Sequence, residues 1–384
     1  MDIKIGFNGC RLREARLYNG MTITEVASLS DVSKQAISQF ENGKAEPKLE
    51  TLMRIMNVLN FPRSYFYEDV QEKLSIGDTY FRSLASITNK ERMMQIENVK
   101  LLITIYRGID EYIAFPDLNI YSVPEDFDFD IEELAENVRE FWHLGEDKIL
   151  NLVNILEENG VIVNSRFTKS KKIDAYSQIG RIGDKSYAVI ILGDDKENAF
   201  RRNFSAAHEL GHILLDDFYN LEEMTKTEYK EMEDTMNRFA GALLVPEESY
   251  RADLKTISKT ELNFYIQLKL KYGVSAAALI VRARQLEEIT HNQYQYLMKQ
   301  LSQKGYRTIE PYDKDVKQME PLYLKEAMRM IIEEDKVTSD EFLSVISDQG
   351  ISLNTDIIED VLNLPNGYLS MNDSQSDIVK LVRR

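Results

Sequence analysis

The sequence predicts a mostly α-helical fold of the α+β class, with one small β-sheet. Three observations carry this prediction. Residues 1–70 read as short helices separated by turn signals, β-type apolar runs occur at 161–163 and 187–192, and residues 250–365 keep a helical period almost throughout. We therefore expect a helical N-terminal domain, a central α+β domain and a helical C-terminal region.

Length and composition narrow the class of protein. The chain has 384 residues, enough for two or three domains that each bury a core, and its hydrophobic content of 43% is ordinary for a globular protein. No apolar run is long enough to cross a bilayer and no secretory signal opens the chain, so no membrane partner is expected. The single cysteine, Cys10, fits the reducing cytoplasm. With four histidines and one cysteine, an all-protein metal site must include a carboxylate.

The negative charge is unevenly distributed along the chain. Residues 1–70 contain nine Lys/Arg and nine Asp/Glu, whereas the remainder contains 38 basic and 55 acidic residues and so holds the whole net charge of −17. An acidic surface repels nucleic acid. Only the N-terminal segment is therefore expected to approach DNA.

Cap and turn signals divide that segment into short helices. Thr22, with Glu25 three positions later, is a capping box that predicts the start of one helix. Ser33 is a good N-cap for the next helix, and Asn42-Gly43 ends it. The apolar residues of this second helix share one face, so three polar side chains are left outside: Lys34, Gln35 and Ser38.

A short helix that exposes these three side chains suits the major groove of DNA. Gln35 can pair bidentately with adenine, whereas Lys34 and Ser38 can reach guanine or phosphate. The pattern predicts binding to a double-stranded operator. The alternative is a small helical bundle that only contacts other proteins, which would not need base-reading side chains at its exposed positions.

Further residues of the segment match a known pattern: Arg11-Leu12, Val32-Ser33-Lys34-Gln35, Ile37-Ser38, Phe40-Glu41-Asn42-Gly43 and Pro47. With them the segment resembles the XRE (Cro/C1-type) helix-turn-helix family. Two positions depart from that family. Ile23 stands where a phosphate-contacting Gln is usual, which is expected to reduce DNA affinity. Asp31 stands where the turn usually has Gly, and because Asp tolerates a left-handed backbone the fold is expected to survive.

Beyond residue 70 the chain is expected to form three further units. Residues 71–115 read as a polar helix, and Ser122–Asp130, with Pro124 and four acidic residues, breaks any helix and marks the best domain boundary. The tail, Asn366–Arg384, is expected to be loose. The expected division is a helix-turn-helix domain at 1–70, a helical connector at 71–130, a central domain at 131–250 and a helical region at 251–384.

The central domain is expected to mix helices with short strands. Gly160 ends its second helix, and Gly193 follows its second strand. The expected helices are 131–142, 147–158, 204–216 and 226–244, and the expected strands are Val161–Val163 and Tyr187–Leu192.

The third of these helices carries the motif His-Glu-Leu-Gly-His. His208 and His212 are four residues apart, so they lie on one helical face where both imidazoles can bind one metal ion. Glu209 lies beside them, placed to accept a proton from a water molecule. The neighbouring residues are apolar, which predicts a buried helix. Burying two histidines costs free energy unless their polar atoms have partners. The alternative is a pair of core or solvated histidines.

Catalytic zinc sites usually have three protein ligands, so a third is expected from a neighbouring helix. Glu233 in the helix 226–244 can supply it, with Asn237 one turn later as a supporting hydrogen-bonding group. His208, His212 and Glu233 are therefore the expected Zn²⁺ ligands, and Glu209 is the expected catalytic residue. This arrangement is of the gluzincin type.

The surroundings of the motif also match a known pattern: Val138-Arg139, Trp142, Leu152-Val153, Leu156-Glu157, Gly160, Ile173-Asp174, Arg201-Arg202-Asn203-Phe204, Asn237-Arg238-Phe239-Ala240 and Leu243-Leu244-Val245-Pro246. With them residues 131–246 resemble the ImmA/IrrE metallopeptidase family. Phe81-Arg82-Ser83-Leu84, Val274-Ser275, Arg282 and Glu310-Pro311 resemble its longer members, in which an XRE domain precedes the peptidase. The resemblance implies the same zinc ligands and the same catalytic glutamate. Met236 replaces a usual Ala, which is expected to shift the helix of Glu233 slightly.

Three functional hypotheses follow. The first is a homodimeric DNA-binding regulator whose zinc endopeptidase cleaves itself or a partner XRE-type repressor, the substrate class that the resemblance implies. The second is a regulator whose zinc domain senses a ligand without proteolysis, and the third is a protease that uses its N-terminus only to dock substrate. Glu209 favours the endopeptidase hypothesis over the ligand-sensing hypothesis, because metal binding alone needs no base. The exposed side chains of Lys34, Gln35 and Ser38 favour the DNA-binding regulator over the protease that uses its N-terminus only to dock substrate.

Parts of the mechanism are less constrained by the sequence. A substrate peptide is expected to add as a strand to a β-edge near Tyr187–Leu192. Tyr176 is a candidate to stabilise the oxyanion, and His143 and His291 are expected to be structural. The helices after residue 250 show no recognisable chemistry and are expected to dimerise or to bind a signal.

Overall fold

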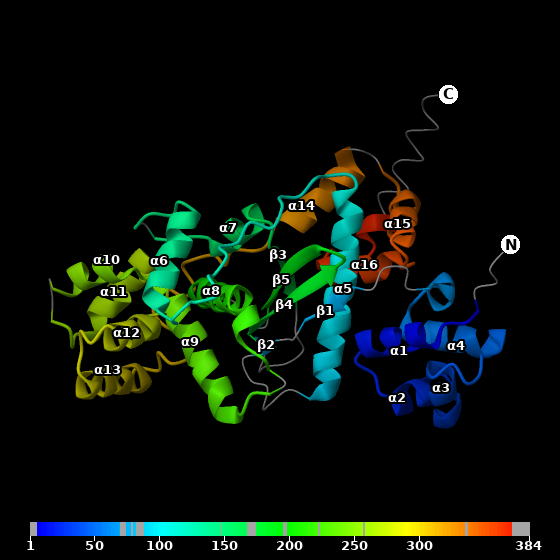
Figure 1. Ribbon diagram of the computed structural model, residues 1–384, viewed down its shortest axis with the longest axis horizontal. Helices are drawn as coiled ribbons and strands as arrows, with labels where there is room; N and C mark the ends of the chain where they lie inside the picture. Colours follow the sequence, from blue (N-terminus) through cyan, green and yellow to red (C-terminus); the bar gives the residue numbers. More distant parts are fainter. Residues whose placement is uncertain are drawn as a thin grey trace.

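The computed structural model describes residues 6–69, 74–77, 80–81, 88–146, 148–166, 174–194, 198–221, 223–255, 258–334 and 337–370. In this part of the chain a small sheet lies between two groups of helices, and the long helix α5 stands between the sheet and the N-terminal helices (Figure 1). The predicted mostly helical α+β class is confirmed.

The N-terminal helices begin and end where the local signals predicted. Thr22 and Glu25 form a complete capping box, in which each side chain accepts a hydrogen bond from the other residue's backbone N–H. Ser33 caps the next helix by accepting from the N–H of Ala36 at 3.1 Å. Asp31 has a φ of 52°, the left-handed turn that Asp was expected to tolerate. The helices are α1 (Gly9–Tyr18), α2 (Ile23–Leu29), α3 (Lys34–Glu41), α4 (Leu49–Leu59) and the 3-10 helix η1 (Ser64–Tyr67).

The described strands form one mixed sheet in the order β1-β4-β5-β3, with β2 also paired to β4. β3 runs parallel to β5, and the other pairings are antiparallel. β4 and β5 form a hairpin whose turn contains Gly183 at a φ of 56°, which favours glycine. The strands are β1 (Ser75–Ile76), β2 (Tyr80–Phe81), β3 (Ile162–Arg166), β4 (Ala175–Ile182) and β5 (Lys185–Gly193).

Two expectations about this region are wrong. The strand predicted at Tyr187–Leu192 is not an open edge, because β5 is paired with β4 on one side and β3 on the other. Residues 71–115 are not one polar helix, because β1 and β2 precede the helix α5 (Asn89–Asp110). Strands of two residues are too short to produce the period-2 alternation by which a strand is recognised.

Helix α5 is a buried helix rather than a polar connector. Thr88 and Glu91 form the capping box that begins it, and its polar first turn suggested a solvated helix. The apolar spacing begins further along, and Val99, Ile103 and Ile105 are completely buried. These residues share a core with one face of the sheet.

The opposite face of the sheet is covered by the helices of the central region. Successive residues of a strand point to opposite faces, and accordingly Ile190 packs with the central helices whereas Val189 and Ile191 pack with α5. The four predicted helices are present: α6 (Ile131–Phe141), α7 (Leu152–Glu158), α8 (Ala199–Leu214) and α9 (Lys226–Leu244). The 3-10 helix η2 (Asp216–Phe218) follows α8, and α10 (Glu247–Leu254), α11 (Leu262–Tyr272), α12 (Ala276–Gln285) and α13 (His291–Gln303) follow α9.

The last helices return to the N-terminal domain (Figure 1). The hydroxyl of Tyr18 donates to Asp360 at 2.8 Å, and the N–H of Ser352 donates to Glu68 at 2.7 Å. The N-terminal helices therefore share one hydrophobic core with α5 and with four C-terminal elements. The elements of this region are α14 (Tyr323–Arg329), the π-helix η3 (Met330–Glu334), α15 (Ser339–Asp348) and α16 (Thr355–Leu362).

Arg82–Leu84 and the tail from residue 371 lie outside the described residues, and the domain limits expected at 70, 130 and 250 stay predictions. Among the described residues no single helix is long and apolar enough to span a membrane, and only the bent pair α11 and α12 meets that test together, by length and composition alone.

Candidate metal centre

Two packed helices carry the residues of the site. His208 and His212 lie four residues apart on α8, and Glu233 lies about two turns after the start of α9. Gly211 allows the two helices to approach closely, since a Cβ atom at this position would lie 3.0 Å from both Met236 and Phe239. The methionine at 236 is fully buried against this contact.

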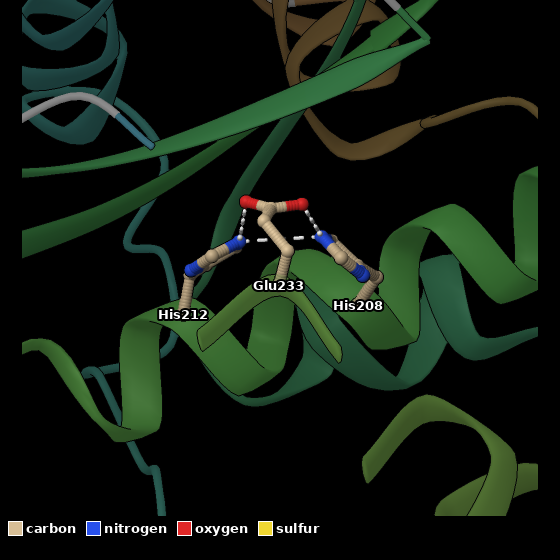
Figure 2. A group of neighbouring side chains, drawn as sticks. All are labelled: His208, His212 and Glu233. Carbon is tan, nitrogen blue, oxygen red and sulfur yellow. Dashed lines mark hydrogen bonds and ion pairs between the residues drawn. The ribbon is translucent and has the colours of Figure 1, made fainter. Parts of the chain in front are cut away.

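The three side chains converge on one point (Figure 2). The Nε2 atoms of His208 and His212 lie 3.2 Å apart, and each lies 3.4 Å from a carboxylate oxygen of Glu233. Tetrahedral zinc with bonds of about 2.0–2.1 Å places its ligand atoms about 3.4 Å from one another. The spacing therefore fits a single zinc-sized ion, and the cluster could hold one.

Burial and the contacts within the cluster set the charge states of His212 and Glu233. His208 and His212 are each 1% exposed and Glu233 is 8% exposed. Burial lowers the pKa of His212 to about 4, so this imidazole is neutral near pH 7 and keeps its lone pair. Burial alone would raise the pKa of Glu233, but hydrogen bonds and charge interactions with the two histidines lower it overall and keep the carboxylate ionised. Two imidazoles and one carboxylate are an ordinary zinc donor set.

Glu209 is held by a residue that the sequence analysis missed. The hydroxyl of Ser177 on β4 donates to Oε2 of Glu209 at 2.8 Å, and both side chains are buried. Strand β4 was not predicted at all. A signal was present, because Ala175–Ile182 is followed by Gly183-Asp184, a two-residue hairpin signature.

Other candidate residues lie elsewhere. The side-chain amide of Asn237 donates to the backbone oxygen of Glu233 at 2.8 Å, so it supports the helix at the ligand rather than the carboxylate. Tyr176 faces the α5 side of the sheet and donates to Gln95 at 2.5 Å, so its candidate role as oxyanion stabiliser is wrong. His291 contacts Gln295 within its own helix, 2.9 Å away.

The candidate DNA-contacting residues lie on the recognition helix of the N-terminal domain. Lys34 and Gln35 are exposed at the start of α3, and Ser38 is partly exposed one turn later. Ile37 and Phe40 hold the other side of the helix in the core, as predicted. The contacts of Lys34, Gln35 and Ser38 with DNA stay a prediction.

These features define a class of protein: a DNA-binding helix-turn-helix domain joined to a metallopeptidase-like domain. Comparison with protein families supports this definition, because residues 12–66 match the helix-turn-helix family and residues 157–284 match the IrrE N-terminal-like domain. The chain thus joins an XRE-type domain to an IrrE-like peptidase domain, as the resemblance implied. The second match begins within α7 and extends through most of α12. No curated protein matches the chain.

Proposed function

We propose that the protein is a cytoplasmic, DNA-binding transcriptional regulator whose zinc-dependent endopeptidase domain cleaves a protein, either itself or a partner XRE-type repressor. The observation that supports it best is the buried cluster of His208, His212 and Glu233, with the carboxylate of Glu209 on the same helix. A cluster for metal binding alone would not need an additional carboxylate beside it.

The roles of the residues follow from this arrangement. His208 and His212 from one helix and Glu233 from the next would hold the ion, which is the gluzincin arrangement. When bound, zinc polarises a peptide carbonyl and lowers the pKa of water. Glu209 takes the proton from the attacking water and passes it to the leaving nitrogen. Ser177 orients Glu209 for both transfers.

The N-terminal domain would supply the DNA contact. Helix α3 presents Lys34, Gln35 and Ser38 at its exposed N-terminal end, which in this fold enters the major groove. Residues 1–70 carry no net charge, so non-specific attraction to DNA is weak and a homodimer on a two-fold operator is proposed to supply the affinity.

A second candidate function has one observation in its favour. A cavity of about 670 Å³ is lined by Arg307 and, on the two helices that also carry the metal cluster, by Ser205 of α8 and by Asn237 and Arg238 of α9. A cavity of this size suits a small-molecule ligand, so the central domain could sense a ligand instead of cleaving a protein.

Mass spectrometry separates the two candidates. The zinc-loaded full chain is incubated alone and with purified XRE-type repressors, beside the Glu209→Gln variant as a matched control. Discrete fragments that form only when Glu209 is present support the endopeptidase. Intact proteins in all mixtures would favour the sensing function.

A further inference from the structure

The chain occupies the outer edge of β4 with its own residues. Ser75 and Ile76 of β1 pair with Arg181 and Gly180, and the N–H of Gly77 donates to the oxygen of Ile179 at 2.8 Å. Tyr80 and Phe81 of β2 pair in the same antiparallel sense with residues 177 and 176. We call β1 and β2 together the edge segment.

The edge segment passes the proposed catalytic base. Tyr80 is the register partner of Ser177, and Ser177 donates its hydroxyl to Glu209. Neighbouring strands lie about 4.8 Å apart. The backbone at residue 80 is therefore one strand spacing away from the residue that orients Glu209.

This edge is also where a substrate strand would bind. All eight residues of β4 pair with β5 on the inner side, so only the outer side of β4 has backbone groups for an additional strand. Helix α8 packs beneath β4, which brings this edge to the metal cluster. An extended substrate peptide would add to β4 as a strand at this edge. It would need the same backbone groups of β4 that now pair with the edge segment.

We propose that the edge segment is an autoinhibitory strand that must leave β4 before a substrate peptide can bind. The inference rests on the proposed endopeptidase function and assigns its regulation. The burial of the cluster agrees with a closed state, because none of its three ligand residues is more than 8% exposed. The substrate is then an extended segment that replaces the edge segment.

The edge segment is suited to exchange. Its two strands contain only two residues each, whereas β4 and β5 pair over eight positions. Ser75 is exposed, and Ile76, which packs against the core, is only partly buried. Short pairings of this kind open at low free energy. A longer peptide can therefore displace them.

The N-terminal domain holds the chain on both sides of the edge segment. Before it, Glu68 accepts hydrogen bonds from Ser352 and its backbone oxygen accepts from Asn8 at 2.9 Å. After it, Lys90 at the start of α5 pairs with Glu25 of α2 at 3.2 Å. These contacts tie Glu68 and the start of α5 to their neighbours, so β1 and β2 are the part of this stretch that is proposed to exchange.

The test uses the zinc-loaded full chain with fluorescein-labelled, unfolded casein peptides as the probe. Binding is followed by fluorescence anisotropy in the Glu209→Gln background, so that the readout does not depend on cleavage. A reversible lock is made with Ser75→Cys and Arg181→Cys, which replace register partners, in a Cys10→Ser background. Directly opposite residues have Cα atoms about 4.5–5.5 Å apart, within the range that a disulfide bridges.

The oxidised lock is expected to abolish probe binding, and reduction of the same protein to restore it. Gly77→Pro removes the N–H that donates to Ile179 and should tighten binding about three- to tenfold. Gly77→Ala keeps the N–H, and because its Cβ would lie 3.3 Å from the Ile179 oxygen it should tighten binding less than Gly77→Pro does. Equal binding by oxidised and reduced protein, or no gain from Gly77→Pro over Gly77→Ala, would overturn the proposal. A third outcome is that the lock controls probe binding, but chains that retain Glu209 do not cleave the probe. This outcome would support the autoinhibitory strand and contradict only the endopeptidase function.

Discussion

Ser177 donates a hydrogen bond to Glu209 at 2.8 Å, and this contact joins β4 to the helix that carries both histidines. Both side chains are buried, so water does not compete with the bond. A buried carboxylate that is fixed by a hydroxyl keeps one orientation toward the neighbouring cluster. The sheet therefore sets the position of the proposed base, although the base itself is on a helix.

Ser177→Ala should keep zinc and lower the cleavage rate about tenfold to a hundredfold, because residues that support a metal site typically contribute this much. Ser177→Thr keeps the hydroxyl and should retain more activity than the alanine variant. Zinc content by elemental analysis and the initial rate on a confirmed substrate measure the two effects. An alanine variant as active as the parent would show that the bond does not orient the base.

The protein should bind about one zinc per chain through the three converging side chains. His208→Ala removes one of these ligands and should lose the metal in elemental analysis. His291→Ala is the matched control, because His291 contacts only its own helix among the hydrogen bonds seen. Full zinc retention by the His208 variant would exclude this cluster as the metal site.

Glu209→Gln should keep zinc and abolish peptide cleavage, because an amide cannot accept the proton of the attacking water. The substitution is nearly isosteric, and its amide oxygen can still accept the hydrogen bond from Ser177. Circular dichroism should therefore show an unchanged fold. Cleavage of a confirmed substrate at the parent rate would mean that another group is the base.

The metal-free protein should lose stability as the pH falls from about 6.5 to about 4. Burial lowers the pKa of His212 from 6.5 to about 4 in the folded state, so within this window only the unfolded state binds the proton. The stabilisation is complete above pH 6.5 and is lost toward the folded pKa. The expected loss in the free energy of unfolding is at most on the order of 3 kcal/mol.

Urea unfolding of the chelator-treated protein at several pH values measures this loss. Glu233 acts in the same direction at lower pH, because its pKa is also lowered on folding. His212→Gln is the matched control and should show a flatter dependence between pH 6.5 and 4. Equal slopes for the parent and this variant would contradict the assigned pKa shift.

Local signals in the sequence predicted the parts of the molecule that depend on local chemistry. The capping box of Thr22 and Glu25 depends on residues three positions apart, and both partners are visible in the sequence. His208 and His212 are one helical turn apart, so the helical period alone places them together. Asp31 was expected to tolerate a left-handed turn, and its φ is 52°.

Features that depend on distant parts of the chain were not predictable in this way. The bond between Ser177 and Glu209 needs a strand and a helix that meet only in the folded sheet. The contact of Tyr18 with Asp360 joins the two ends of the chain, and no periodic pattern encodes it. The residues of β5 do not show that β3 pairs on its other side, so the sequence wrongly predicts an open edge there.

The N-terminal domain is expected to choose its DNA by reading bases. The first 70 residues carry no net charge, so sequence-independent attraction is weak and base contacts must supply much of the affinity. Gln35 is exposed at the start of α3, where it can pair with a base. Gln35→Ala should cost about 1–3 kcal/mol on the preferred operator and relax discrimination at one position in each half-site.

Lys34→Ala is the comparison that separates base reading from phosphate binding. This variant should weaken binding to all sequences and reduce the slope of log affinity against log salt by about one for each phosphate that Lys34 neutralises. Mobility shifts with randomised operators, repeated at two salt concentrations, measure both variants. If Gln35→Ala bound every sequence as the parent does, α3 would not read bases, and the N-terminal domain would be a module that docks protein substrates.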